Sequence, residues 1–487
     1  MVKSLLYAAL MTALFASAAL GQFLQPEVIT TELPHSSFDF GWGGARAEGM
    51  GNAYLGLADD ITAGAWNPAA LVVFEGPMLG LSWGATAPRG YTNFNIQSNL
   101  WRFNHTGSLS NVSGLNFIGP FRIKGHAFVG SVNYTRNFED MLGTGYKFAI
   151  DQIREVPRHN IRELDTFSVD VGVQELYEGG VSSVAFSMGT RVYENSSVGL
   201  GVNIYTGENR FEVNQHAITY DLPIDPGGQE VDAASNTYLV DTVQFSGVNF
   251  TLAYKATGDR LNVGVVLRTP FSLNLKNNRS IYNVTTINDK PIEEGTDTTF
   301  FDNQLTKYTL PLTVSAGLAL KVNDNSVLTM DAEYRNFSSL KYKRRDSLFI
   351  DPAGNNEEFF TDIDPEWNST FSMRFGGEYR YASSVGTIPF RAGLGLIPIP
   401  WPNRSESKSP QSSFNFPHMV FLPFVKALNK DDTPIRYTFS AGTGIHWSQI
   451  MLDWAYTFST VERNWGESVV EAQVQDHHFG FTFTGVF

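Results

Sequence analysis

The sequence predicts an all-β transmembrane protein, a 14-stranded antiparallel outer-membrane β-barrel with a short N-terminal hatch (plug) inside the lumen. Three observations predict this fold class. Apolar and polar residues alternate with a period of two along many segments after residue 77. The connections between these segments alternate between short turns and long loops, as in transmembrane barrels. A stretch rich in Gly and Ala precedes the first of these segments.

The N-terminal residues predict export. Lys3 supplies a positive charge, an apolar run of 15 residues covers 5–19, and small residues end at Gly21. This pattern predicts a cleaved signal peptide over 1–21, which is too short to be a transmembrane helix. The chain contains no cysteine, which excludes a disulfide framework, a thiolate metal site and lipoprotein processing at the cut.

Composition narrows the class of protein further. The net charge of −14 does not suggest a nucleic-acid partner. The 37 Phe and 19 Tyr residues exceed what a soluble domain commonly needs, whereas a barrel uses them in its lipid-facing band and aromatic girdles. No run of 18 apolar residues follows the signal, so helical spans are not expected. The sequence therefore places the protein in the bacterial outer membrane.

The segment 22–76 is predicted to form an N-terminal extension and the hatch. Its Gly- and Ala-dense part, 41–71, has neither clean helical nor clean strand periodicity over its full length. Small residues at this density let backbone approach backbone, which suits a compact element held inside another structure. Residues 45–60 could form a short helix, and Asn67-Pro68 predicts a turn.

The remaining residues, 77–487, are predicted to form the barrel. Even positions from Leu310 to Leu320 are apolar, and the last strand places Phe479, Phe481 and Phe483 on one face. Strands are expected at 77–87, 111–119, 125–136, 180–193, 197–207, 241–256, 260–275, 308–322, 325–341, 368–382, 386–399, 434–447, 450–461 and 472–487. Long loops are expected at 88–110, 137–179, 208–240, 276–307, 342–367, 400–433 and 462–471.

Short motifs in the hatch carry a family resemblance. The runs are Ala45-Arg-Ala-Glu-Gly-Met-Gly-Asn-Ala, Ala58-Asp-Asp and, above all, Asn67-Pro68-Ala69. Placed before fourteen predicted strands, they resemble the FadL-type family of outer-membrane transporters of hydrophobic compounds, whose hatch carries an Asn-Pro-Ala motif. One departure is Ala70, where the family pattern has Gly.

The resemblance implies passive uptake of hydrophobic compounds such as long-chain fatty acids or aromatic hydrocarbons, without a cofactor or an energy source. It implies that the ligand passes a pocket above the hatch and leaves sideways into outer-membrane lipid. Asn67, Pro68 and Ala69 would then form a hatch turn that shifts when ligand binds; the alternative is an ordinary turn. Gly130 would mark an inward kink of the third strand that opens the wall, although small residues are common in barrels.

Several arginines alternate with the apolar face and are therefore expected to point into the lumen. Arg191, Arg268, Arg374 and Arg391 are the candidates for binding a ligand carboxylate. The alternative is pairing inside the lumen with Asp331, Glu333, Glu378 or Asp453, which is the favoured interpretation for any single arginine.

The remaining features predict no chemistry. The segment 148–156 could be a short amphipathic helix in a loop. His477 and His478 point to opposite faces of one strand, so no metal site is expected. No catalytic grouping is found, and the chain is not expected to be an enzyme.

The chief alternative function is that of a FadL-like barrel of the type IX secretion system, which shuttles cargo proteins and would bring a protein partner. An apolar lumen around the hatch would favour uptake of small molecules over this alternative. A general porin is a third possibility, against which the hatch argues.

Overall fold

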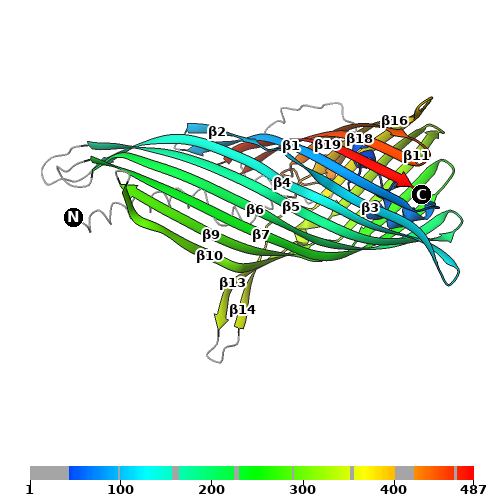
Figure 1. Ribbon diagram of the computed structural model, residues 1–487, viewed down its shortest axis with the longest axis horizontal. Coiled ribbons are helices and arrows are strands. Elements are labelled where there is room, and N and C mark those ends of the chain that lie inside the picture. The colour runs from blue at the N-terminus through cyan, green and yellow to red at the C-terminus, as the bar shows by residue number, and fades with distance from the viewer. Residues whose placement is uncertain are drawn as a thin grey trace.

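The computed structural model describes residues 43–96, 99–155, 164–223, 230–287, 290–350, 356–400, 422–465 and 469–487. All strands belong to one sheet, and its first and last strands, β1 (Met78–Ile96) and β19 (Val469–Val486), pair along their length. Every neighbouring pair is antiparallel, so the sheet closes into the long barrel of Figure 1. The predicted signal peptide, 1–21, lies outside the described residues.

Nineteen strand segments build the fourteen strands of the wall, because five wall strands are each divided in two. The divided wall strands are β2 (Asn99–Thr106) with β3 (Leu109–Ile123), β8 (Leu261–Arg268) with β9 (Phe271–Ile287), β10 (Lys290–Leu310) with β11 (Thr313–Asn323), β12 (Ser326–Arg335) with β13 (Tyr342–Ile350), and β14 (Asn356–Ile363) with β15 (Thr370–Ser383). The undivided ones are β1, β4 (His126–Glu155), β5 (Leu164–Tyr193), β6 (Ser196–Pro223), β7 (Glu230–Thr257), β16 (Gly386–Pro398), β17 (Ile435–His446), β18 (Ile450–Trp465) and β19. The predicted strand number is confirmed.

The predicted faces are confirmed as well. On β11, Leu318 and Leu320 are exposed on the outer wall, whereas Ser315, on the face toward the lumen, is buried. On β19, Phe479 and Phe483 are exposed and Thr482 is buried. On these two strands, small and polar residues therefore face the lumen, and large apolar residues cover the surface that faces lipid.

The predicted long loops are wrong in one respect, because much of their length continues the strands. β4 and β5 pair as far as Glu155↔Leu164, so the described part of the segment 148–156 is strand and not the expected helix. Pairing between neighbouring long strands satisfies backbone groups that a loop would leave to water. Figure 1 shows that β4 to β7 extend far toward the end of the barrel opposite the short turns, beside which the C-terminus lies.

Few helices accompany the barrel. Before the first strand come α3 (Ala45–Gly49), α4 (Ala63–Trp66) and the 3-10 helix η1 (Pro68–Val73). A short 3-10 helix, η2 (Phe337–Ser339), divides β12 from β13, and α5 (Leu422–Leu428) lies between β16 and β17. Among the residues described, no helix has the length and apolar character needed to cross a membrane.

Candidate functional site: the hatch and the lumen beside it

The hatch is the segment 43–76, and its central turn follows from the Asn67-Pro68-Ala69 motif. Asn67 is extended (φ −148°), and its Oδ1 accepts a hydrogen bond from the Ala69 N–H at 3.1 Å. Asn is a favoured N-cap, and Pro at the first helical position loses no hydrogen bond there. The predicted turn is therefore present, as the start of η1.

Asn67 also holds the two halves of the hatch together. Its side chain is fully buried, and Nδ2 donates to the Leu55 carbonyl oxygen at 3.0 Å. Nearby, Asp60 Oδ1 accepts bonds from the N–H of Thr62 at 2.8 Å and from its hydroxyl at 2.6 Å. Burial raises the pKa of the Asp60 carboxyl, although the charge of Arg46 and the bonds from Thr62 oppose this shift. The hatch is thus a compact, internally bonded unit.

A belt of wall glycines lets the hatch backbone lie directly against the wall. A Cβ at Gly264 would stand 2.3 Å from the Leu55 carbonyl oxygen, and one at Gly376 would stand 2.4 Å from the Met50 oxygen. Both distances are shorter than any allowed contact, so only glycine fits. The belt consists of Gly189, Gly199, Gly264, Gly317, Gly376, Gly393, Gly442 and Gly480.

Polar side chains of the wall bind the hatch backbone at several places. Asp331 Oδ2 accepts from the N–H groups of Tyr54 at 2.7 Å and Leu55 at 2.9 Å. The other wall groups, each with its hatch partner, are Ser187 with Gly64 O (2.8 Å), Ser197 with Ala69 O (2.7 Å), Ser440 with Gly49 O (3.2 Å), Thr482 with Ala45 N (2.9 Å), and Lys255 with Leu57 O. Because these bonds satisfy backbone groups that carry no strand or helix partner, they define one position for the hatch.

A buried charge network forms a further link between hatch and wall. Arg46 donates to both carboxylate oxygens of Glu378, at 2.8 and 3.1 Å, and pairs with Asp59 at 2.7 Å. Arg391 donates to the same Glu378 at 2.7 Å and to Asp453 at 2.7 Å. The side chain of Glu378 is fully buried, and Arg380 also pairs with it at 2.8 Å, so three arginines compensate its charge.

Two of the predicted carboxylate-binding arginines are thus paired inside the protein. Arg391 pairs with Glu378 and Asp453, as the favoured interpretation predicted. Arg374 approaches Glu333 at 3.9 Å. Arg46 was not predicted as a site residue. It is the one arginine in the Gly- and Ala-rich run 41–71, and a charged side chain in a segment expected to lie inside the barrel could have indicated a buried ion pair.

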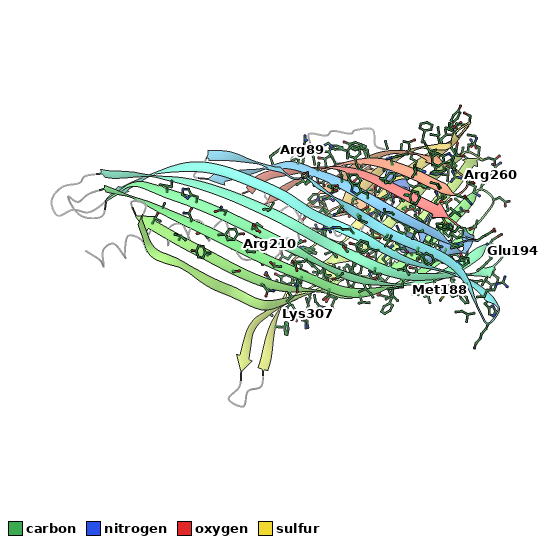
Figure 2. All side chains as sticks on the ribbon, viewed as in Figure 1. Arg89, Met188, Glu194, Arg210, Arg260 and Lys307 are labelled. Atoms are coloured by element: carbon green, nitrogen blue, oxygen red, sulfur yellow. The ribbon has the colours of Figure 1, made fainter. Side chains whose placement is uncertain are left out.

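Arg191 lies elsewhere than predicted. It has the register of the lumen-facing positions of β5, but it is exposed close to the end of that strand. Figure 2 shows Glu194, three residues further on, at the short-turn end of the barrel. Alternation predicts the face of a strand correctly but not whether the hatch covers that position.

The fourth predicted arginine, Arg268, lies beside the hatch. Its Nη2 donates to the Trp66 carbonyl oxygen at 3.4 Å. It also lines a small pocket of about 30 Å³ that is partly open to solvent. The other residues around this cavity are Tyr205, Asn249, Thr269, Phe271, Leu310, Pro311, Thr313, Arg335 and Phe337.

The cavity combines aromatic surface with positive charge. Tyr205 and Phe271 stack with ring centres 4.9 Å apart. Arg335 pairs with Glu333 at 2.7 Å, and Arg268 interacts electrostatically with Glu333, Arg335 and Arg374. Several guanidinium groups therefore surround one glutamate. Sequence analysis did not find Arg335, since nothing in the strand pattern distinguishes it from other charged residues.

The apolar lining continues along the lumen away from the hatch. Val181, Phe245 and Leu275 are buried positions of one cross-strand row. Leu273, Tyr308 and Tyr342 form another, in which the two tyrosine rings stack at 4.9 Å. These residues and the apolar hatch residues belong to one continuous cluster.

The wall has an interruption beside the third wall strand. β3 pairs with β4 up to Gly114↔Thr135, and β2 resumes the pairing at Thr106↔Gly143. In between, residues 136–142 of β4, all of them described, have no partner on β2 or β3, and all but Asn137 pair with β5. We call residues 136–142 the pairing gap.

Gly130 lies outside the pairing gap. It pairs with Gly119 on one side and with Met188 on the other, without a shift of register. The ladder therefore has no bulge at Gly130, and the register of β4 shifts instead between Arg136 and Phe138. Glycine permits a bend in a strand, but the ladder determines whether one forms.

Within the described ranges, no group of three or more His, Asp or Glu side chains could hold a metal ion. The chemistry that the site offers is binding by apolar surface, hydrogen bonds and charge.

Comparisons with known proteins agree with this architecture. Residues 43–409 match a family model described as outer membrane protein transport protein (OMPP1/FadL/TodX). A FadL homologue from Pseudomonas aeruginosa has a TM-score of 0.51 at 14% identity, covering 91% of this chain and 98% of its own. The toluene transporter TbuX from Ralstonia pickettii has a TM-score of 0.50 at 12% identity, covering 92% and 100%. No curated protein sequence matches significantly.

Proposed function

The chain belongs to the FadL/TodX family of outer-membrane transport proteins, and on that premise we propose that it takes up hydrophobic molecules passively, with lateral exit controlled by the hatch. As a member of this family it is an outer-membrane β-barrel for hydrophobic compounds and not an enzyme. The proposal concerns the direction of transport, the class of substrate and the route. Long-chain fatty acids and aromatic hydrocarbons are the two candidate substrates.

The observation that carries the proposal is the apolar lining of the lumen next to a closed hatch. Val181, Phe245, Leu273 and Leu275 offer an apolar solute a surface that a water-filled pore would not. The Gly belt leaves little room between hatch and wall, which argues against a general porin. The same lining argues against a channel for folded or unfolded protein cargo, which would expose polar backbone to it.

The cavity at Arg268 favours fatty acids over aromatic hydrocarbons. A neutral hydrocarbon gains nothing from guanidinium groups, whereas a carboxylate forms charge-assisted hydrogen bonds with them. Tyr205 and Phe271 would contact the alkyl chain while Arg268 and Arg335 lie near the carboxylate. The related toluene transporter carries a neutral molecule. The positive charge of Arg268 and Arg335 is therefore the feature that favours fatty acids over aromatic hydrocarbons as the substrate.

Lateral exit is supported by the pairing gap. Opening a barrel wall normally breaks a row of backbone hydrogen bonds, each of which contributes about 1 kcal/mol. At residues 136–142 that pairing on the β3 side is already absent. An apolar molecule that leaves there enters lipid without passing through water.

Native mass spectrometry and uptake together test the proposal. The purified barrel is extracted gently and examined for bound ligand, and cells that lack their own fatty-acid transporter receive the gene and labelled oleate. Retained fatty acid and restored uptake of oleate are the expected results. A barrel that carries no lipid, restores no uptake and co-purifies with a folded protein would overturn the proposal and favour the type IX alternative.

A further inference from the structure

The helix α5 packs on the outer surface of the barrel. Its Val425 is fully buried in a cluster with Met373, Leu396 and Tyr437. These three wall residues point away from the lumen, because their neighbours along the strands, such as Arg374 and Thr438, face inward and are buried. The helix therefore covers β15 to β17 from the side that faces the membrane.

An asparagine fastens the end of α5 to the wall. Asn429 Nδ2 donates to the Phe371 carbonyl oxygen at 3.0 Å, and its Oδ1 accepts from the Phe371 N–H at 2.9 Å. Nδ2 also donates to the Val425 carbonyl oxygen at 2.7 Å. Asn429 thus takes the place of a neighbouring strand at Phe371, where the ladder with β16 has not yet begun.

The two exposed sides of α5 differ in chemistry. At 100° per residue, Phe424 and Leu428 lie on one flank of the helix, and Lys426 lies on the other. Phe424 is 51% exposed and Leu428 is 48% exposed. Lys430, just beyond the helix, continues the charged flank, and exposed Asp431 balances its charge. A surface helix in water does not usually leave one flank apolar and uncovered.

The position of α5 along the wall coincides with the expected membrane boundary. Its contact residue Met373 is ten residues before Ser383, where β15 reaches the short turn. A strand crosses the hydrocarbon layer in about 9–11 residues. Tyr379 and Tyr381 are exposed toward the turn, and Phe371 packs edge-on against Phe424 with ring centres 6.1 Å apart at the other boundary. These positions correspond to two aromatic girdles.

We propose that α5 is an interfacial helix seated in the outer leaflet of the membrane, with Phe424 and Leu428 among the lipid acyl chains and Lys426 toward the head groups. The apolar band of the outer wall continues directly into its apolar flank through Phe371 and Phe375. Because Asp431 offsets Lys430, the seat depends on burial of apolar area and not on anionic lipid.

The natural absence of cysteine allows a direct test by spin labels at single introduced cysteines. Variants Phe424→Cys, Leu428→Cys and Lys426→Cys are refolded into phosphatidylethanolamine–phosphatidylglycerol vesicles. Collision rates are measured with oxygen, which is concentrated in lipid, and with a nickel chelate present in the water on both sides. Phe250→Cys on the outer wall and Asp324→Cys in a short turn provide the lipid and water references.

Labels at 424 and 428 are expected to resemble the one at 250, with oxygen collisions several-fold more frequent than nickel collisions, while the label at 426 resembles the one at 324. Equal nickel access at 424, 426 and 428 would overturn the proposal. Spin–spin broadening at 424 alone would overturn it too, because it would show a second copy of the chain on this flank. Folding of each variant is first checked by electrophoresis, in which a folded barrel migrates differently before and after heating. Only variants that pass this check are used for the collision measurements.

Discussion

Arg46 of the hatch and Glu378 of β15 form a two-point ion pair, with Nε to Oε2 at 2.8 Å and Nη2 to Oε1 at 3.1 Å. The two residues are separated by 332 positions in the sequence. Removing one partner of such a pair leaves a buried charge without compensation, which costs more than the pair itself contributes.

Replacing Glu378 with Gln should therefore loosen the hatch and destabilise the barrel. Three arginines would lose their shared carboxylate, and a cost of about 3 kcal/mol is expected. The measurement is the urea midpoint of unfolding in vesicles, together with the rate of protease cleavage within the hatch. Glu194→Gln is the control, since Glu194 is exposed at a short turn. Equal stability of the two variants would show that the network contributes nothing.

The Gly belt yields a prediction with a neighbouring control. Gly376→Ala places a methyl group 2.4 Å from the Met50 oxygen, so the hatch must shift, at a cost of about 1–3 kcal/mol. Gly377→Ala points away from the hatch, and its nearest neighbour is the Leu328 side chain at 3.3 Å. Vesicle-swelling assays should show leakage of small sugars through the first variant only. If neither variant leaks, the close contact between the hatch and the wall at Gly376 is not what closes the barrel to small sugars.

Replacing Arg268 with Gln should weaken binding of fatty acids selectively. A charge-assisted hydrogen bond contributes about 1.5–3 kcal/mol, which corresponds to roughly 10- to 100-fold in affinity. Isothermal titration with oleate and with the alcohol of the same chain length should show the loss for the acid alone. Arg260→Gln, in the turn before the same strand, serves as the control. An equal loss for acid and alcohol would assign Arg268 a structural role.

Closing the pairing gap should stop transport. The register on both sides of the gap places residue 110 opposite residue 139. A disulfide between cysteines introduced at Ser110 and Glu139 is expected to reduce oleate uptake to the background of cells without the protein. A reductant should restore uptake, and each single-cysteine variant should transport normally. Full uptake by the cross-linked protein would exclude exit through this part of the wall.

Asn67→Ala tests the hatch turn. The variant loses the cap on the Ala69 N–H and the bond to Leu55, for an expected cost of about 1–2 kcal/mol. If the turn moves with the ligand, native mass spectrometry should show less retained fatty acid, while the barrel remains folded. Ser440→Ala removes a wall bond to Gly49 at the other side of the hatch and controls for general loosening. Equal ligand retention in both variants would reduce Asn67 to a structural residue.

The strand number, the faces of the strands and the hatch turn were predictable because each depends on residues close together in the chain. Alternation with a period of two identifies a wall strand wherever one face meets lipid, as in β11 and β19. Asn67 and Pro68 act on the next residues of the backbone. Where the strands extend beyond the membrane, the apolar band ends and alternation weakens, so 137–179 looked like a loop.

The tertiary structure alone decided what the lumen residues contact. Arg391 and Arg191 look alike in sequence, yet Arg391 lies opposite Glu378 in the β15–β16 pair and within reach of Asp453, whereas Arg191 lies beyond the hatch. The pairing gap at 136–142 and the outer seat of α5 are likewise contacts between elements, which the pattern within any one segment does not reveal. The local pattern determines which face of a strand a side chain occupies, whereas its partner depends on register and on the position of the hatch, which only the closed barrel sets.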